Sequence, residues 1–195
     1  MILRIFVVCL CLLCLPKGVF AQVDINKNVT DYVIPLKNGT KLIEKWHKVL
    51  ERQPIKEGNA KVNYETLVNV FESVRGIYKS DSYNYQSFWF KPNVNFDYWA
   101  TPNEFKANNG GDCEDYAISW YYAAREAGFK ANQLNIWVGW LPNHDNMQHA
   151  VLAVDIDGKQ YILDNFNNKI MLASDYMHKE FKLMFRLNEN GWSTK

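Results

Sequence analysis

The sequence predicts an α+β domain in which amphipathic helices come first and a meander of antiparallel strands follows. Apolar residues recur at helical spacing in two N-terminal stretches, at 42–50 and 67–77. A third helix is predicted over 113–127. Beyond it the apolar period changes from about four to two, and Asp157-Gly158 is typical of a hairpin turn between two such stretches.

The predicted elements follow one another with clear boundaries. Residues 22–40 are weakly patterned and predict an extended arm, and the first helix covers the stretch around Trp46. Pro54 and Gly58 interrupt the pattern before a second helix over 62–78. The helix over 113–127 ends at Gly128, and its inward face is expected to hold four residues: Ala117, Ile118, Tyr121 and Ala124.

Four strands are expected after these helices. The first alternates through Leu134, Ile136, Val138 and Trp140, and the next two cover 149–156 and 159–164 on either side of the hairpin turn. A fourth is expected over 181–187. Residues 80–110 form an aromatic loop, which must pack on the core or line a groove because so many apolar rings cannot stay in water.

The first residues have the pattern of a secretory signal peptide. Arg4 is followed by an apolar run from Ile5 to Leu15, which is too short to span a bilayer comfortably, and Val19-Phe20-Ala21 offers a cleavage site. Residues 1–21 are therefore predicted to be a signal peptide, and 22–195 a single domain. An uncleaved membrane anchor is the alternative. Export through this signal places the mature protein in the periplasm, without a membrane span.

Composition and charge exclude several functions. With 48% hydrophobic and 22% charged residues, the chain is ordinary for a globular protein and unlike a disordered or fibrous one. Loss of Arg4 and Lys17 with the signal leaves 20 basic and 21 acidic residues, a net charge of −1. No cluster of lysine or arginine stands out, so binding to nucleic acid or to an anionic membrane is not expected.

Cys113 is the only cysteine that remains after cleavage, since Cys9, Cys11 and Cys14 belong to the signal. No intramolecular disulfide is then possible. A lone thiol in an oxidising compartment indicates either a reactive residue or a buried, inert one.

The sequence favours a reactive Cys113 because a histidine and an aspartate are expected to lie in positions that would support its chemistry. A helix N-terminus lowers the pKa of a thiol, and the Gly110-Gly111-Asp112 turn places Cys113 at one. Counting outward from the hairpin turn, Asp164 falls beside Val151, within about two residues of His149. We therefore predict that Cys113 is a nucleophile, His149 its base and Asp164 the group that orients the base. The alternatives are a strand histidine satisfied by the backbone and an aspartate that caps the next turn.

The acidic neighbours of Cys113 oppose this chemistry. Asp112, Glu114 and Asp115 would raise the pKa of the thiol. They can be explained as an N-cap and first-turn residues of the helix, or as ligands of a hard cation such as Ca²⁺. The residue pattern alone favours capping.

At these residues the sequence resembles the bacterial transglutaminase-like cysteine peptidases of the LapG type. The resemblance is carried by 97–102 (DYWATP), by 111–118 (GDCEDYAI), and by 149–153 with 163–165 (HAVLA and LDN). It covers most of the mature chain. One departure is that Gln148 directly precedes His149, where the family often has glutamine two residues before the histidine.

The resemblance implies a papain/transglutaminase-like fold with a triad of Cys113, His149 and Asp164. It also implies Ca²⁺ dependence, with Asp112, Glu114 and Asp115 as ligands, and so favours calcium over capping. Its implied substrate is the N-terminal region of a large cell-surface adhesin, whose cleavage releases biofilm cells. Its implied regulator is an inner-membrane receptor that senses cyclic di-GMP. A transglutaminase on the same triad and a non-catalytic binding module remain as alternatives.

Overall fold

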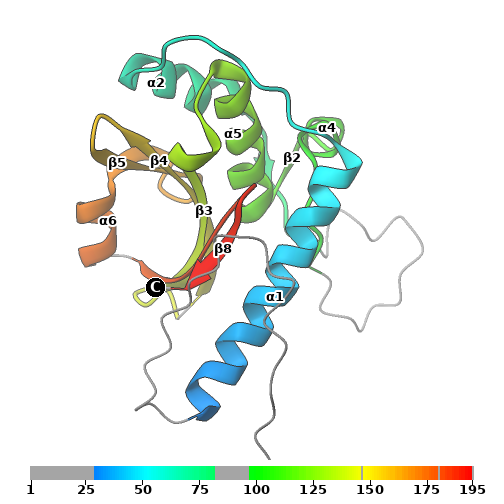
Figure 1. Ribbon diagram of the computed structural model, residues 1–195, viewed down its shortest axis with the longest axis vertical. Helices are drawn as coiled ribbons and strands as arrows, with labels where there is room; N and C mark the ends of the chain where they lie inside the picture. The colour runs from blue at the N-terminus through cyan, green and yellow to red at the C-terminus, as the bar shows by residue number, and fades with distance from the viewer. Residues whose placement is uncertain (1–28, 82–96, 146, 180, 195) are drawn as a thin grey trace, which may run out of the picture.

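The computed structural model describes residues 29–81, 97–145, 147–179 and 181–194 (Figure 1). The predicted signal peptide and most of the predicted aromatic loop lie outside these ranges. Among the described residues, no helix is both long enough and apolar enough to cross a membrane.

The domain is built on a six-stranded sheet in the order β6-β5-β4-β3-β7-β8, and every neighbouring pair is antiparallel. The strands are β3 (Leu134–Leu141), β4 (Met147–Ile156), β5 (Lys159–Asp164), β6 (Lys169–Leu172), β7 (Lys182–Asn188) and β8 (Gly191–Thr194). The helices are α1 (Val29–Arg52), α2 (Tyr64–Ser73), α4 (Pro102–Ala107), α5 (Cys113–Ala127) and α6 (Ala173–Lys179). The predicted α+β class is confirmed.

Two hydrophobic clusters cover the two faces of the sheet. Because side chains alternate along a strand, Leu152 and Val154 of β4 point into a core shared with α1, α2 and α5, whereas Val151 and Ala153 point into a second one under α6. Figure 1 shows α5 on one side of the curved sheet and α6 on the other. One face of the sheet therefore packs against α5, and the other face is covered by α6.

Helix α5 agrees with its predicted bounds. Its predicted inward residues are completely buried: Ala117, Ile118, Tyr121 and Ala124. Gly128 ends the helix with φ of 114°, a left-handed conformation that favours glycine, and its N–H donates to the carbonyls of Ala124 and Arg125.

Two predicted boundaries are wrong. Helix α1 begins at Val29, inside the segment predicted as an extended arm. Helix α2 ends at Ser73, and Ile77–Tyr78 instead form a short strand, β1, that pairs in parallel with β2 (Gly110–Gly111). Ile77 is 59% exposed, so it does not continue the buried stripe of α2. The helical spacing of apolar residues reflects only neighbours along the chain. Here the pairing of Ile77–Tyr78 with Gly110–Gly111 determines the conformation instead.

Arg125 ties the end of α5 to the turn before β8. It is 2% exposed; its guanidinium donates to Glu189 at 2.6 Å and to the Phe129 carbonyl at 2.7 Å, and it pairs with Glu57 at 2.6 Å. Arg125→Ala should lower the free energy of unfolding by about 3–5 kcal/mol, because it removes one partner of a buried ion pair. Chemical denaturation measures this. Glu57→Gln is the matched control: the Glu57 side chain is 61% exposed, so a change below about 1 kcal/mol is expected.

Candidate active site

The start of α5 is shaped by two glycines. Gly110 has φ of 136°, and a Cβ atom there would lie 1.9 Å from the Ile77 carbonyl oxygen. A Cβ on Gly111 would lie 2.2 Å from an Asp115 carboxylate oxygen. Any side chain would thus separate β1 from β2 or displace the first turn of α5. The glycine pair lets the chain turn directly into the helix, with Asp112 at the N-cap and Cys113 as the first helical residue.

Cys113 and His149 line one cavity of about 440 Å³. Cys113 is partly buried and is a free cysteine. Its thiol donates a hydrogen bond to Glu114 Oε2 at 3.2 Å. Burial raises the pKa of this thiol well above its ordinary value, and the charges of Glu114 and Asp112 raise it further, against a hydrogen bond from the Ala150 backbone that lowers it. The thiol is therefore protonated when these carboxylates are charged and nothing neutralises them.

His149 and Asp164 form a buried pair across β4 and β5. The hairpin register runs from Ile156 opposite Lys159 to Leu152 opposite Leu163, so Asp164 comes next on its strand, as the residue count predicted. His149 Nε2 lies 2.7 Å from Asp164 Oδ1, and the two residues are 3% and 0% exposed. The structure thus brings the predicted base and its predicted orienting group together.

The Asp164 carboxylate is held on both oxygens. Oδ1 also accepts from the Phe166 N–H at 2.9 Å, and Oδ2 accepts from the Asn167 side-chain amide at 2.7 Å. Burial alone would raise the pKa of Asp164, but the hydrogen bond and charge of His149, together with these two donors, lower it below its ordinary value. The group therefore remains an anion beside the imidazole.

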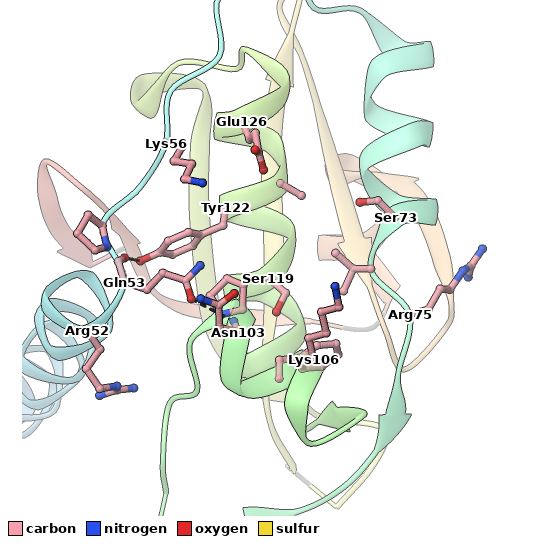
Figure 2. Close-up of a pocket in the computed structure, with 15 residues that line it drawn as sticks. Arg52, Gln53, Lys56, Ser73, Arg75, Asn103, Lys106, Ser119, Tyr122 and Glu126 are labelled. Carbon is pink, nitrogen blue, oxygen red and sulfur yellow. Dashed lines mark hydrogen bonds between the residues drawn. The ribbon is translucent and has the colours of Figure 1, made fainter.

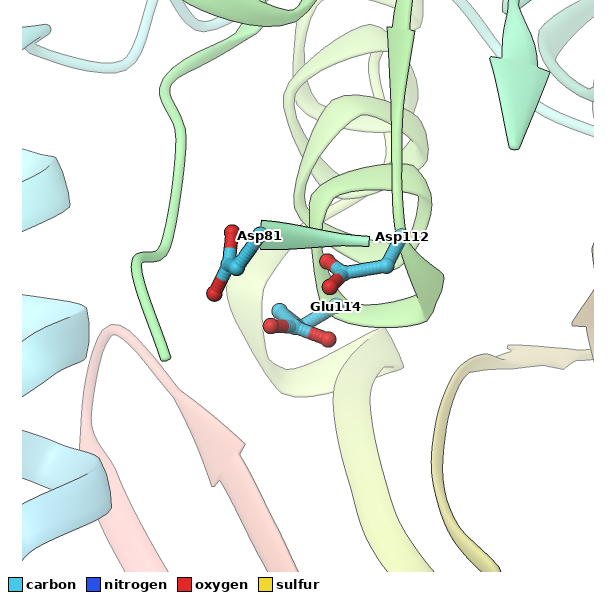
Figure 3. Close-up of side chains that lie close together, drawn as sticks. All are labelled: Asp81, Asp112 and Glu114. Carbon is cyan, nitrogen blue, oxygen red and sulfur yellow. The ribbon is translucent and has the colours of Figure 1, made fainter. Parts of the chain in front are cut away.

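Three carboxylates meet beside the nucleophile. Figure 3 shows Asp81, Asp112 and Glu114 facing one another, and each offers an oxygen within 4.8 Å of the others. Burial raises the pKa of all three, and repulsion from Asp112 adds to the rise for Asp81 and Glu114. Asp81 Oδ1 and Asp112 Oδ1 are buried without a hydrogen-bond partner among the described residues. Buried, unpartnered carboxylate oxygens are the donor set that a hard cation requires.

Asp115, predicted as a third ligand beside Asp112 and Glu114, lies outside this cluster. Its Oδ1 accepts from the Ala100 N–H at 2.7 Å and its Oδ2 from the Asp112 N–H at 3.4 Å. It is fully buried, and burial followed by repulsion from Asp112 raises its pKa to about 8. Asp115 thus joins the 97–101 segment to the first turn of α5, which is a supporting role for the acidic cluster.

Asp81 is the third carboxylate of this cluster, and the sequence pattern did not indicate it. It lies far from Cys113 along the chain and adjoins no recognisable motif. Its Oδ2 accepts from the Tyr98 N–H, which connects it to the DYWATP segment. Only the packing of these two segments beside the start of α5 brings the carboxylate to the site.

A larger cavity of about 730 Å³ lies elsewhere, on the outer side of α5 (Figure 2). It is lined by residues of α5 such as Ser119 and Tyr122, and by basic residues including Lys56 and Lys106. It contains none of the predicted site residues. Judged by volume alone, this cavity would be the candidate active site. The thiol, the imidazole and the carboxylates instead identify the smaller cavity around Cys113 as the candidate active site.

The cysteine lies at the N-terminus of a helix packed on an antiparallel sheet and lines one cavity with a buried histidine that is bonded to an aspartate. This is the arrangement of a transglutaminase-like thiol enzyme. The family of bacterial transglutaminase-like cysteine proteinases matches residues 48–194, so the chain belongs to this family and is a cysteine peptidase. No curated protein matches the chain significantly.

Solved structures with this fold include LapG of Legionella pneumophila. Its calcium-bound form is 24% identical to the chain, with a TM-score of 0.56 and coverage of 83% of each chain. Its EGTA-treated form is also 24% identical, with a TM-score of 0.55 and coverage of 83% of this chain and 82% of the other. At this identity the likeness supports the fold, and the residue roles must be argued from the site itself.

Proposed function

We propose that the protein is a Ca²⁺-dependent cysteine endopeptidase whose triad is Cys113, His149 and Asp164. One observation carries the proposal: a cysteine at a helix N-terminus lines the same cavity as a buried histidine that is bonded at 2.7 Å to a buried aspartate. Because Nε2 of His149 is engaged by Asp164, Nδ1 is the ring nitrogen left for the thiol.

The reaction follows from this geometry. His149 accepts the thiol proton, and the thiolate attacks the carbonyl carbon of a peptide bond. The backbone N–H of Cys113, at the positive end of α5, donates to the oxyanion. His149 then protonates the leaving amine, and water hydrolyses the thioester. The indole N–H of Trp99 donates to Asp97 Oδ1 at 3.1 Å, so it is already engaged and is not a free second donor.

A cation at Asp81, Asp112 and Glu114 resolves the electrostatic conflict at the nucleophile. Without one, burial raises the pKa of the thiol, the charges of Glu114 and Asp112 raise it further, and the neutral form is favoured. Carboxylate oxygens favour hard cations such as Ca²⁺. Calcium is proposed because LapG of Legionella pneumophila, which shares the fold, has a calcium-bound form. When bound, the ion would neutralise the carboxylates and supply the positive field that a thiolate needs.

The substrate and the setting are proposed from the family resemblance. We place the mature protein in the periplasm after cleavage of the signal peptide at 1–21. There it cleaves the N-terminal region of a large cell-surface adhesin and so controls biofilm attachment. Sequestration by an inner-membrane cyclic di-GMP receptor belongs to the same proposal.

The decisive experiment is incubation with the N-terminal region of a large surface adhesin encoded in the same genome. Two fragments should appear with Ca²⁺ present, and none with Cys113→Ala or with a chelator. Mass spectrometry separates the alternatives. Fragments that gain one water indicate hydrolysis, whereas a cross-linked product that loses ammonia indicates a transglutaminase. Equal cleavage by wild type and Cys113→Ala would refute the proposal.

Calcium should stabilise the protein more at pH 8 than at pH 5. Burial, followed by repulsion from Asp112, raises the pKa of Asp81 to about 7. The folded state therefore binds this proton more tightly than the unfolded chain. The resulting stability is present at low pH and lost as the pH rises from about 4 to about 7. Calcium needs the deprotonated carboxylates and replaces the lost protons.

The measurement is the calcium-induced rise in Tm at the two pH values, each against a chelator. Asp81→Asn should reduce the rise at pH 8 and leave Tm in chelator unchanged or higher. A calcium-induced rise of equal size at pH 5 and pH 8 would contradict a site built from these carboxylates.

A further inference from the structure

The larger cavity, of about 730 Å³ on the outer side of α5, gathers positive charge. Among the described residues, four basic side chains line it, and the one carboxylate that lines it is that of Glu126. The basic residues come from three separate parts of the chain: Arg52, Lys56, Arg75 and Lys106. Only the fold brings these charges together, so no local run of basic residues indicates them. We call this space the basic cavity.

The four positive charges are available to a ligand, because all four side chains are exposed. Arg52 and Arg75 each pair with one glutamate, and both pairs are partly exposed to solvent. Exposed ion pairs are weak, so an anionic ligand can replace the glutamate. Lys56 and Lys106 form no ion pair within the described part of the chain.

A buried hydroxyl group also lines the basic cavity. Ser119 is 5% exposed, and its Oγ has no hydrogen-bond partner among the described residues. A buried hydroxyl without a partner is costly, and a carboxylate can accept its proton. Figure 2 shows Ser119 on α5, with Arg52 on one side of it and Arg75 on the other. Positive charges that are spread in this way fit a chain with several carboxylates better than a single small anion.

An intermediate cavity of about 360 Å³ lies between the basic cavity and the active site. It shares Val74 and Arg75 with the basic cavity, and Tyr78 with the active-site cavity around Cys113. Arg75 and Tyr78 are exposed, so the side chains that separate the three cavities lie at the surface. An extended polypeptide bound at Cys113 can therefore follow these cavities to the basic one.

The spacing along α5 sets the smallest distance that such a polypeptide covers. Ser119 lies six residues after Cys113, which is about 9 Å along the helix axis. An extended chain advances about 3.3 Å per residue. A substrate residue in the basic cavity is therefore at least about three residues from the cleaved bond, and the cavity does not restrict the residues directly at that bond.

We propose that the basic cavity is an exosite, which binds acidic side chains of the protein substrate away from the bond that Cys113 attacks. Lys56, Arg75 and Lys106 pair with carboxylates there, and the Ser119 hydroxyl donates a hydrogen bond to one of them. A cleft lined by one sign of charge increases the association rate of an oppositely charged ligand by about 10- to 1000-fold. This proposal rests on the peptidase function proposed above and adds the class of segment that the enzyme recognises.

The test uses the full mature protein with Ca²⁺ and two substrates. One is the N-terminal region of the adhesin, and the other is a neutral hexapeptide that spans the bond cleaved in it. Lys56→Glu combined with Lys106→Glu should lower kcat/KM for the adhesin at least about tenfold and leave kcat/KM for the hexapeptide within about twofold. Arg52 is left unchanged, because it donates to the carbonyl of Trp99, which lines the active-site cavity.

Lys48→Glu combined with Lys159→Glu is the matched control for the change in net charge. Both lysines are exposed and line none of the three cavities, so both substrates should be cleaved at the rates of wild type. Salt provides a second measurement. Because salt screens exposed charges, it should lower kcat/KM for the adhesin more in wild type than in the variant with Lys56→Glu and Lys106→Glu.

An exchange of charge between enzyme and substrate guards against loss of folding. An adhesin segment whose acidic residues outside the hexapeptide are replaced by lysine should be cleaved slowly by wild type and faster by Lys56→Glu with Lys106→Glu, which an unfolded protein cannot produce. If this variant cleaves the natural adhesin as wild type does, or loses activity equally on both substrates, the exosite is refuted and the peptidase function stands. If wild type does not cleave the adhesin, the peptidase function fails, and the exosite with it.

Discussion

Asp164→Asn is expected to lower kcat about 10³- to 10⁴-fold while the protein remains folded. The substitution preserves size in a side chain that is completely buried. An amide oxygen can still accept from His149 Nε2 and the Phe166 N–H, which share Oδ1 in the structure. What is lost is the negative charge that stabilises the imidazolium formed when His149 takes the thiol proton. The amide also no longer selects the histidine tautomer, and the equivalent substitution in serine peptidases reduces kcat by about 10⁴.

Single-turnover cleavage of the adhesin segment measures this effect, and the thermal unfolding midpoint shows whether the fold is retained. Asn167→Ala is the matched control. It removes the 2.7 Å hydrogen bond to Asp164 Oδ2 and leaves the charge in place, so a loss of less than about tenfold is expected. If Asp164→Asn retained a kcat within tenfold of wild type, Asp164 would be a structural cap and not a member of the triad.

Glu114→Gln should reduce the reactivity of Cys113 in the presence of Ca²⁺ and increase it in the presence of a chelator. Because the expected change in Cys113 reactivity has opposite signs in the two conditions, it distinguishes a metal ligand from a nearby charge that binds no metal. Glu114 raises the pKa of the Cys113 thiol, so without a cation its neutralisation makes the thiolate easier to form. With a cation bound, the same change removes a ligand and weakens the positive field.

The expected size of the effect follows from the range of such electrostatic shifts. A neighbouring charge moves a pKa by about 1–3 units, which corresponds to a change of about 10- to 1000-fold in the thiolate fraction. Chelation of wild type should therefore lower the rate of Cys113 alkylation by at least about tenfold. The rate of alkylation at pH 7 with Ca²⁺ and with chelator measures both predictions.

Glu126→Gln is the matched control for this experiment. Glu126 is an exposed carboxylate on the same helix, so its neutralisation should change the alkylation rate little in either condition. If Glu114→Gln increased the rate in both conditions, the cluster would be a set of repelling charges without a cation. Asp112→Asn should behave as Glu114→Gln does, because Asp112 also raises the thiol pKa and also belongs to the cluster.

The hairpin shows why the histidine–aspartate pair could be located without a structure. The turn at Asp157-Gly158 is a local signal, and antiparallel pairing then relates each residue of one strand to one residue of the other. The register observed from Ile156–Lys159 to Leu152–Leu163 is the one obtained by counting. The proximity of His149 to Asp164 could therefore be predicted from the number of residues between each of them and the hairpin turn.

The acidic cluster shows the opposite case. Asp112, Glu114 and Asp115 are neighbours in sequence, yet only the first two face the same point, since successive residues of a helix project in different directions. Asp81 completes the cluster from the segment that follows β1, which no periodic pattern describes. Burial raises the pKa of Asp81 to about 7, and that burial arises only when segments that are distant along the chain pack together.

Some features of helix α5 and the segments around it follow from local sequence signals, and others follow only from tertiary contacts. The sequence by itself determined what short-range chemistry controls: the glycine turn before Cys113, the bounds of α5 and the register of the β4–β5 hairpin. The tertiary structure alone decided the pairing of Ile77–Tyr78 with Gly110–Gly111 and the place of Asp81 in the acidic cluster. These features join segments that are distant along the chain, and their contacts depend on the packing of the whole domain, which no local pattern encodes.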